Sequence, residues 1–92
     1  MTAADEGRLR LRDAGMEWRT LEDETVVLDL QGSRYFAIND TGTLLWPLLA
    51  QGTTRTALIA AVTERWEVGA GQAARDVDAF CAELDAAGLL ER

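Results

Sequence analysis

The side chains that most often carry out chemistry are scarce in this chain. The sequence contains no His and no Lys, and Cys81 is its single Cys. Without His, the usual general base, the catalytic triad and the common metal sites are missing. One thiol cannot build a zinc knuckle or an iron–sulfur cluster, and the lack of Lys excludes a Schiff base and a Walker-type phosphate site. We therefore expect no enzymatic activity, no metal site and no cofactor.

The remaining reactive groups, Cys81 and several acidic pairs, have simpler interpretations. Cys81 falls on the apolar stripe of an expected helix, where a free Cys usually acts as a small hydrophobe. The carboxylates of residues 22–24 lie in an expected turn, where water solvates them. Asp76 and Asp78 are two residues apart on a helix and do not share a face. Asp76 lies beside the apolar stripe, at a position that a bound ligand could reach.

The charge balance disfavours nucleic acid as a partner. Nine Arg face sixteen acidic residues, which gives a net charge of −7 and a pI near 4.4. Binding to a phosphate backbone depends on cationic side chains that displace counterions. The local cluster of Arg8, Arg10 and Arg12 lies in what we expect to be an N-terminal arm.

The length and the cysteine content indicate one small domain in a reducing compartment. A chain of 92 residues can bury one modest core. It contains no apolar run long enough to span a membrane, and its acidic N-terminus does not resemble a secretory signal. A single Cys fits a reducing environment, so we expect a cytoplasmic protein. Gly7 and Gly15 flank an Arg/Leu alternation and favour a solvated arm over residues 1–14, with the domain over residues 15–92.

The apolar pattern predicts an α+β fold in which three strands precede three helices. Between Met16 and Ile38 the pattern has a period of two, as in half-buried strands. A polar turn interrupts it first, and Gln31-Gly32 interrupts it again, where Gly is free to adopt a positive φ. These signals describe a three-stranded antiparallel meander whose third strand is Arg34 to Ile38. With the helices that follow, we expect a winged helix-turn-helix-like arrangement.

Capping residues mark the three helices. The expected boundaries are an N-cap at Asn39 or Asp40, an end at Gly52, a second N-cap at Thr53 or Thr54, and a third helix over residues 72–87 followed by Gly88. Pro47 removes a backbone donor, so it should kink or loosen the first helix. Each of Trp18, Trp46 and Trp66 lies among other apolar residues, and we expect all three to pack in the core.

The third strand is the feature that points to a function. Its outer edge is free unless another element covers it, and a free edge presents unpaired N–H and C=O groups. An extended peptide can add to such an edge, with affinity from main-chain bonds and specificity from alternate side chains. Arg34, Tyr35 and Phe36 would offer a charge, a phenol and an apolar ring there. Coverage of the edge by the third helix is the alternative that the pattern leaves open.

Several stretches, taken in order, carry a resemblance to a known family. They are Val26–Leu30, Gln31–Asn39, Thr41-Gly42, Leu45-Trp46, Asp76-Val77, Phe80, Leu84 and Gly88-Leu89-Leu90. In this order and spacing they resemble the PqqD-like leader-peptide-binding domains, also called RiPP recognition elements, of ribosomal peptide natural-product pathways. Pro47 departs from the family's pattern. The stand-alone length, with Tyr35-Phe36 before Asn39, is most similar to the discrete leader-binding protein of lasso-peptide pathways.

The resemblance implies that the leader of a precursor peptide adds as an antiparallel strand to the third strand, in a groove walled by the third helix. The implied contact residues are Arg34, Tyr35, Phe36, Ala37 and Ile38 on the strand, and Arg75, Asp76, Ala79, Phe80 and Glu83 on the helix. Spacing alone leaves the opposite flank of the helix open, with Ala74, Asp78 and Cys81. Such a protein would raise the effective concentration of the precursor near a maturation enzyme.

The implied partners are the precursor leader, a separate leader protease and a cyclase of the same pathway, with no nucleic acid and no membrane. An alternative within the family is a PqqD-type peptide chaperone that serves a radical-SAM enzyme. An alternative from another class is a winged-helix DNA-binding regulator. The third helix disfavours it, because Arg75 there is outnumbered by acidic residues.

Overall fold

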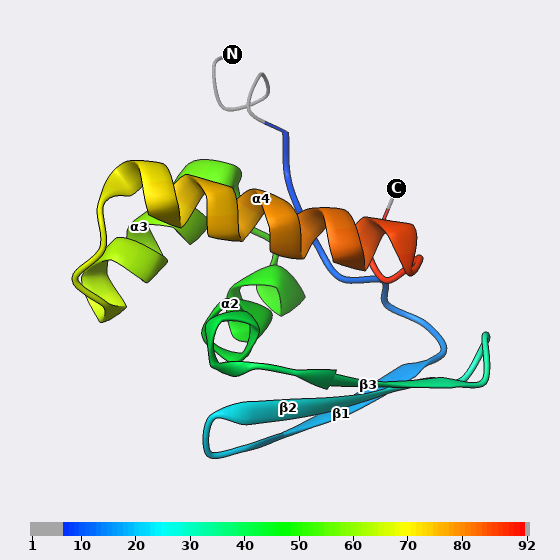
Figure 1. The fold of residues 1–92 in the computed structure, drawn as a ribbon. Helices are drawn as coiled ribbons and strands as arrows, with labels where there is room; N and C mark the ends of the chain where they lie inside the picture. Colours follow the sequence, from blue (N-terminus) through cyan, green and yellow to red (C-terminus); the bar gives the residue numbers. More distant parts are fainter. Residues whose placement is uncertain (1–6, 92) are drawn as a thin grey trace.

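The computed structural model describes residues 7–91, which form three strands followed by three helices (Figure 1). The elements are β1 (Met16–Leu21), β2 (Glu24–Asp29), β3 (Arg34–Ile38), α2 (Asp40–Gln51), α3 (Arg55–Arg65) and α4 (Ala70–Ala86). The sheet is antiparallel and has the order β1-β2-β3, so that β1 and β3 are its two edges. The expected α+β class and order of elements are confirmed. None of the helices in this part of the chain is both long and apolar enough to cross a membrane.

All three helices lie on the same side of the sheet, and α2 packs directly against β2 and β3 (Figure 1). The side chains of Thr25, Val27 and Asp29 on β2 point to this face and are buried. The helices add most of the core, which includes Leu45, Trp46, Leu49, Leu58, Val62, Ala73, Val77 and Leu84. The opposite face of the sheet is open to solvent although it is partly apolar, since Leu28 is 43% exposed and Leu30 is 57% exposed.

Side-chain caps begin α2 and α3 where the sequence predicts them, whereas α4 begins at Ala70, before the expected residue 72 and without a side-chain cap. The Asn39 side chain accepts a hydrogen bond from the Gly42 N–H at 3.0 Å, and Thr54 accepts one from the Ala57 N–H at 3.2 Å. Gly88 follows α4 with a φ of +75°, as expected for the residue after a helix end. Pro47 lies on the exposed side of α2, and the helix continues past it to Gln51.

The turn between β2 and β3 differs from the expected one. Ser33, with a φ of +55°, adopts the left-handed conformation, and Gly32 does not. Gly32 is needed for a different reason, because a Cβ atom there would lie 2.7 Å from the Asp29 carboxylate and 2.9 Å from Nε of Arg34. The glycine therefore allows the backbone to pass close to an ion pair.

The expectation of a solvated arm is wrong for the segment from Leu9 to Arg12. Leu9 and Thr53 exchange two backbone hydrogen bonds, of 2.8 and 2.9 Å, and Leu11 is only 4% exposed. The N–H of Arg12 donates to the Leu89 carbonyl at 2.8 Å, so the segment joins the helices to the C-terminal residues. The side chains of Leu9 and Leu11 pack in or against the core, whereas Arg8 and Arg10 are exposed. Residues 1–6 of the expected arm lie outside the described residues.

The expectation that all three Trp are core residues is also wrong for one of them. Trp46 is 2% exposed and Trp66 packs partly buried against the core, whereas Trp18 is 45% exposed. Trp18 lies on the edge strand β1, where its ring stays partly open to solvent and has an aromatic neighbour. That neighbour is Trp46, at 6.4 Å between ring centroids.

A buried carboxylate joins three parts of the chain. Asp29 is 2% exposed and accepts hydrogen bonds from Arg12 at 2.7 Å and from Arg34 at 2.8 Å. The same two guanidinium groups also donate to the backbone at the end of α4, at the carbonyls of Gly88 and Ala87. The two Arg side chains hold the pKa of Asp29 well below its usual range. This cluster ties the N-terminal segment, the β2–β3 hairpin and α4 together.

At Gly42, α2 comes close to side chains of both β3 and α4. A Cβ atom at this position would lie 2.3 Å from Cγ2 of Ile38 and 2.7 Å from the ring of Phe80. Real Cβ atoms do not approach other atoms so closely. The absence of a side chain here therefore sets how near Phe80 comes to the start of α2.

We expect the Asp29 cluster to make the fold sensitive to acid. Its lowered pKa means that the ionised carboxylate stabilises the folded state above the unfolded pKa of about 3.9, and that this contribution is lost as the pH falls further. Urea unfolding followed by Trp fluorescence at about pH 7 and about pH 3 measures the loss. Asp29→Asn should be less stable at neutral pH and lose less on acidification. Glu64→Gln, at an exposed position on α3, should keep the wild-type pH dependence. An unchanged acid response in Asp29→Asn would contradict this assignment.

A methyl group at position 42 should disturb the packing between α2 and α4. We expect Gly42→Ala to lower the free energy of unfolding by about 1–3 kcal/mol, because the side chains of Ile38 and Phe80 must move. Gly71→Ala is the matched control, since the nearest atom there is Nη1 of Arg75 at 4.0 Å. The control should be neutral or slightly stabilising. Equal effects of the two substitutions in urea unfolding would show that Gly42 is not a close-packed position.

Candidate peptide-binding groove

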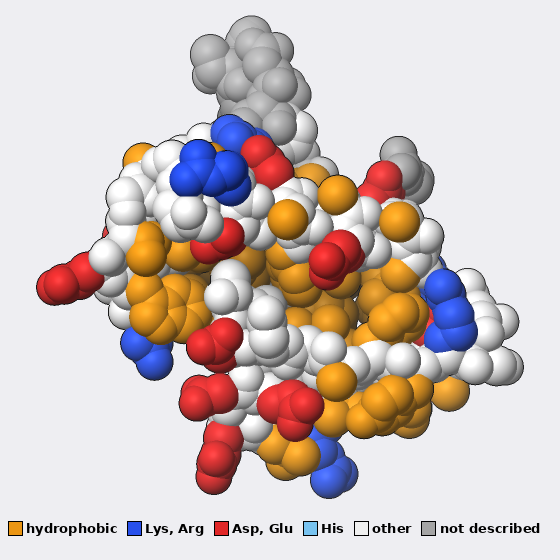
Figure 2. Space-filling view, viewed as in Figure 1, with side chains coloured by type: hydrophobic (Ala, Val, Ile, Leu, Met, Phe, Trp, Pro, Cys, Tyr) orange, Lys and Arg blue, Asp and Glu red, His pale blue; other side chains and the backbone are white. Residues whose placement is uncertain are grey.

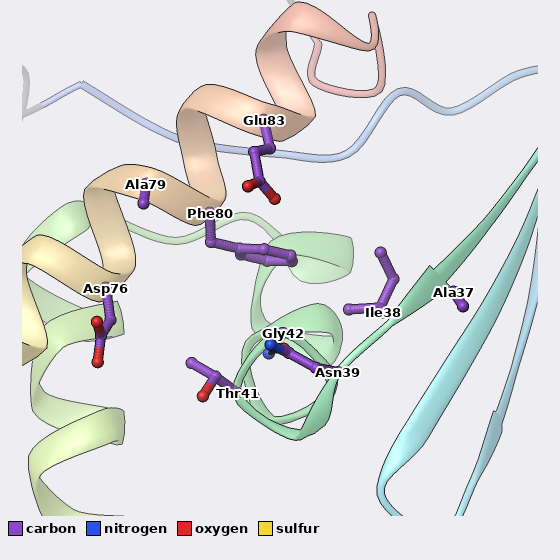
Figure 3. A pocket seen from close by; sticks show the side chains of 9 residues that line it. All are labelled: Ala37, Ile38, Asn39, Thr41, Gly42, Asp76, Ala79, Phe80 and Glu83. Atoms are coloured by element: carbon purple, nitrogen blue, oxygen red, sulfur yellow. Dashed lines mark hydrogen bonds between the residues drawn. The ribbon is translucent and has the colours of Figure 1, made fainter.

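A groove lies between β3, the start of α2 and one face of α4 (Figure 3). Its cavity has a volume of about 360 Å³ and is lined by Ala37, Ile38, Asn39, Thr41, Gly42, Asp76, Ala79, Phe80 and Glu83. Hydrophobic side chains fill the bottom of this hollow in the space-filling view, and acidic side chains stand at its rim (Figure 2). The groove therefore has apolar side chains such as Ile38 and Phe80 at its bottom, polar groups from the start of α2, and carboxylates at its opening.

One stripe of α4 forms the upper wall of the groove. Asp76, Ala79, Phe80 and Glu83 follow each other at helical spacing and so share a face. The ring of Phe80 projects from the helix between Glu83 and Gly42, toward Ile38 (Figure 3). All four of these residues were expected contacts. The fifth expected helix residue, Arg75, does not line the cavity, and its guanidinium donates to Gln72 at 3.1 Å.

The opposite flank of α4 contacts other elements. Asp78 accepts hydrogen bonds from Arg55 of α3 at 2.8 and 2.9 Å. Cys81 lines a separate hollow together with residues of the N-terminal segment, among them Leu9. Burial and the nearby Asp78 raise the pKa of the Cys81 thiol, so it stays protonated and poorly nucleophilic. The flank with Asp78 and Cys81 thus faces away from β3.

β3 and α4 lie alongside each other in opposite directions. At one end, Arg34 begins β3 and donates to the Ala87 carbonyl just after α4. At the other end, Ile38 and Phe80 both approach Gly42. Arg34 also pairs with Asp29 and lies 5.2 Å from the centre of the Phe36 ring. The Arg34 side chain thus closes one end of the space between β3 and α4, while the cavity occupies the other end.

Within residues 7–91, no backbone hydrogen bond joins the outer edge of β3 to another segment. Successive residues of an antiparallel strand direct their N–H and C=O groups alternately to the two sides. The Leu30 N–H donates to the Gly15 carbonyl at 2.8 Å. Because the direction of the backbone groups alternates along the strand, the N–H and C=O groups of the even-numbered residues of β2 point toward β1. The odd-numbered residues of β2 then bond to β3, where Val27 lies opposite Phe36. This leaves the backbone groups of Tyr35 and Ala37 directed away from β2.

The side chains of β3 divide between the two faces of the sheet. Phe36 and Ile38 point to the helices, and Ile38 is 9% exposed. Tyr35, which is 64% exposed, lies on the opposite face with Ala37. Of the expected strand contacts, Ile38 offers its side chain to the groove, whereas Tyr35 and Ala37 offer their backbone to an added strand.

The start of α2 supplies three groove residues that the expected set lacks. They are Asn39, Thr41 and Gly42, which follow directly after β3. The Asn39 side chain is held by its capping bond to the Gly42 N–H. The N-cap signal and the Thr41-Gly42 pair were visible in the sequence, but only the fold shows that this helix start forms the floor of the groove.

The charges of the groove come from two acidic residues of α4. The carboxylate of Asp76 accepts a hydrogen bond from Gln72 at 2.8 Å. The carboxylate of Glu83 makes no hydrogen bond or ion pair to any described residue. No Arg lines the cavity, and the described residues contain no group of three side chains that could hold a metal ion. The arrangement is suited to binding an extended, positively charged or neutral chain.

The comparisons with known proteins agree with this geometry. The family model of coenzyme PQQ synthesis protein D (PqqD) matches residues 24–90. The solved structure of TbiB1 in complex with the TbiA(beta) leader peptide is 28% identical with a TM-score of 0.81, covering 89% of this chain and 94% of that one. The structure of lasso peptide synthetase B1 complexed with the leader peptide is 26% identical with a TM-score of 0.79, covering 91% and 98%. No curated protein is significantly similar in sequence.

These findings confirm the resemblance that the sequence suggested. The family match begins at β2 and ends after α4, so it includes both walls of the groove. Because it spans more than half of the chain, and because the fold is shared with two leader-binding proteins, this chain belongs to the PqqD family.

Proposed function

We propose that this protein binds the leader segment of a ribosomally made precursor peptide and catalyses no reaction itself. The observation that carries the proposal is the open edge of β3 beside a groove of about 360 Å³. Two similar structures, of TbiB1 and of a lasso peptide synthetase B1, contain leader peptides. The protein therefore serves lasso-peptide biosynthesis, and it delivers the precursor to a separate leader protease and a cyclase.

The leader binds as a fourth, antiparallel strand next to β3. Its backbone pairs with the outward-directed N–H and C=O groups of Tyr35 and Ala37. Alternate leader side chains then enter the groove against Ile38 and Phe80. A bound leader holds the rest of the precursor close to the maturation enzyme, which raises its effective concentration without any new chemistry.

A second candidate within the same class is a peptide chaperone for a radical-SAM enzyme. The match to the family model of coenzyme PQQ synthesis protein D favours it. Both candidates use the same groove, so they differ in the precursor that binds and not in the mode of binding. The two candidate functions can be distinguished by identifying the precursor and the enzymes that are encoded near the gene.

Fluorescence polarisation with labelled leader peptides tests the proposal. The probes are the TbiA(beta) leader and the leader of any precursor encoded near this gene. We expect Phe80→Ala to weaken binding about tenfold or more, because the ring forms the apolar wall of the groove. Val68→Ala, at an exposed position between α3 and α4, should bind like the wild type.

The same assay separates main-chain pairing from side-chain contacts. N-methylation of those leader amides that face β3 removes donors and should abolish binding, whereas N-methylation of the alternate amides should not. Tyr35→Ala should have a smaller effect than Phe80→Ala, since the Tyr35 side chain lies on the opposite face. Absence of binding by every leader at saturating protein would refute the proposal.

The acidic rim should select for basic side chains in the peptide. Display of a random peptide library against the wild-type protein should enrich Lys or Arg two positions from an apolar residue, because Glu83 lies one helical turn from Phe80. Glu83→Arg should reverse the preference to Asp or Glu. Glu64→Arg changes the net charge equally but lies on α3, so it should keep the wild-type preference. Equal selection by all three proteins would contradict an electrostatic role of Glu83.

A further inference from the structure

The second edge of the sheet, on β1, is also open. β1 pairs with β2 on one side, and in the described part of the chain no backbone hydrogen bond joins Met16–Leu21 to another segment. The strand is largely exposed, with Trp18 at 45% and Leu21 at 53%. A free edge with apolar side chains is a template for pairing with another strand.

The alternation of backbone groups defines which residues of β1 are available. The bond from Leu30 to Gly15 shows that the odd-numbered residues at this end of the sheet bond to β2. The backbone groups of Met16, Trp18 and Thr20 therefore point outward. A strand that pairs with β1 must place its own outward residues opposite these three.

A second copy of β1 satisfies this requirement in an antiparallel arrangement around a two-fold axis. Four registers are centred on interior residues of the strand, and an axis at residue 20 places Arg19 opposite the uncharged Leu21. An axis at residue 17 places Glu17 opposite Glu17 of the second copy, and an axis at residue 19 places Arg19 opposite Arg19. An axis at Trp18 instead places Glu17 opposite Arg19 on both sides of the axis. Only this register pairs opposite charges, and it does so twice.

The side chains on both faces fit the register centred on Trp18. Glu17 and Arg19 would lie on the solvent-exposed face of the sheet as a closely spaced, non-hydrogen-bonded pair. The two Trp18 rings would meet on the other face, where each already packs against Trp46 at 6.4 Å between centroids. Contact between the rings would cover part of the aromatic surface that the isolated chain exposes.

We propose that two copies of this protein associate through their β1 edges, with Trp18 on the two-fold axis, into one continuous six-stranded sheet. The two β3 edges then lie at opposite ends of this sheet. Each copy keeps its groove between β3 and α4 open, so the dimer carries two independent peptide sites. The contact is short, because each copy contributes one strand of six residues, and the net charge of −7 on each copy opposes it. The dimer is therefore weak and depends on concentration.

Sedimentation velocity tests the proposal. The full chain is measured over a range of concentrations, up to the high protein concentrations that are used for NMR. The wild type should shift from monomer to dimer as the concentration rises. Glu17→Arg and Arg19→Glu should each abolish the dimer, because either substitution places like charges opposite each other. An equimolar mixture of the two variants should dimerise again, because every cross-strand pair then has opposite signs. The double variant Glu17→Arg/Arg19→Glu should also dimerise.

The equimolar mixture shows whether the single variants are folded, because two misfolded variants would not form a dimer when mixed. A wild type that stays monomeric at every concentration overturns the proposal. So does a dimer that survives both single substitutions, which would place the contact elsewhere, for example on the apolar face with Leu28 and Leu30. Peptide binding by the single variants should equal that of the wild type, because β3 lies at the other edge.

Discussion

The buried carboxylate of Asp29 is the interaction on which the arrangement of the groove depends. Two guanidinium groups bind it, and each also reaches a carbonyl at the end of α4. Through Arg34, the β2–β3 hairpin is hydrogen-bonded to the end of α4, in addition to the close approach of the two walls of the groove at Gly42. A buried charge is tolerable only with such partners. The same cluster explains why the glycine at position 32 cannot carry a side chain.

The groove combines two kinds of recognition that come from different parts of the chain. The sheet edge contributes backbone groups, which bind any extended peptide in the right direction. The helix face contributes Phe80 and two carboxylates, which in the proposed complex distinguish one peptide from another. Arg34, which was expected to contact the peptide, lies at the closed end of the groove and holds it together through Asp29 and Ala87. In the proposed complex, affinity and selectivity come from separate elements, and the polar cluster connects these elements.

Many features of the fold and of the groove could be predicted from the sequence, because they follow from the pattern of residues that are close in the chain. The period-two strands, the caps at Asn39 and Thr54 and the stripe with Asp76, Ala79, Phe80 and Glu83 all depend on residues close in sequence. The failures concern contacts between distant residues. Arg12 and Asp29 are 17 positions apart, and nothing local shows that an Arg in an apparent arm neutralises a carboxylate in a strand. Likewise, the orientation of Tyr35 depends on the register with β2, and the exposure of Trp18 depends on the sheet ending at β1.

The outward backbone groups of Tyr35 and Ala37 have a consequence for how this surface changes over time. Point substitution alters a side chain but leaves the N–H and C=O in place, with Pro as the exception because it lacks the N–H. The side chains at these two positions face solvent on the far side of the sheet and are not needed for pairing. Their identity can therefore drift while the strand-binding capacity stays the same. A scan of side-chain substitutions along β3 would not detect the role of the backbone N–H and C=O groups, because every residue except Pro carries both.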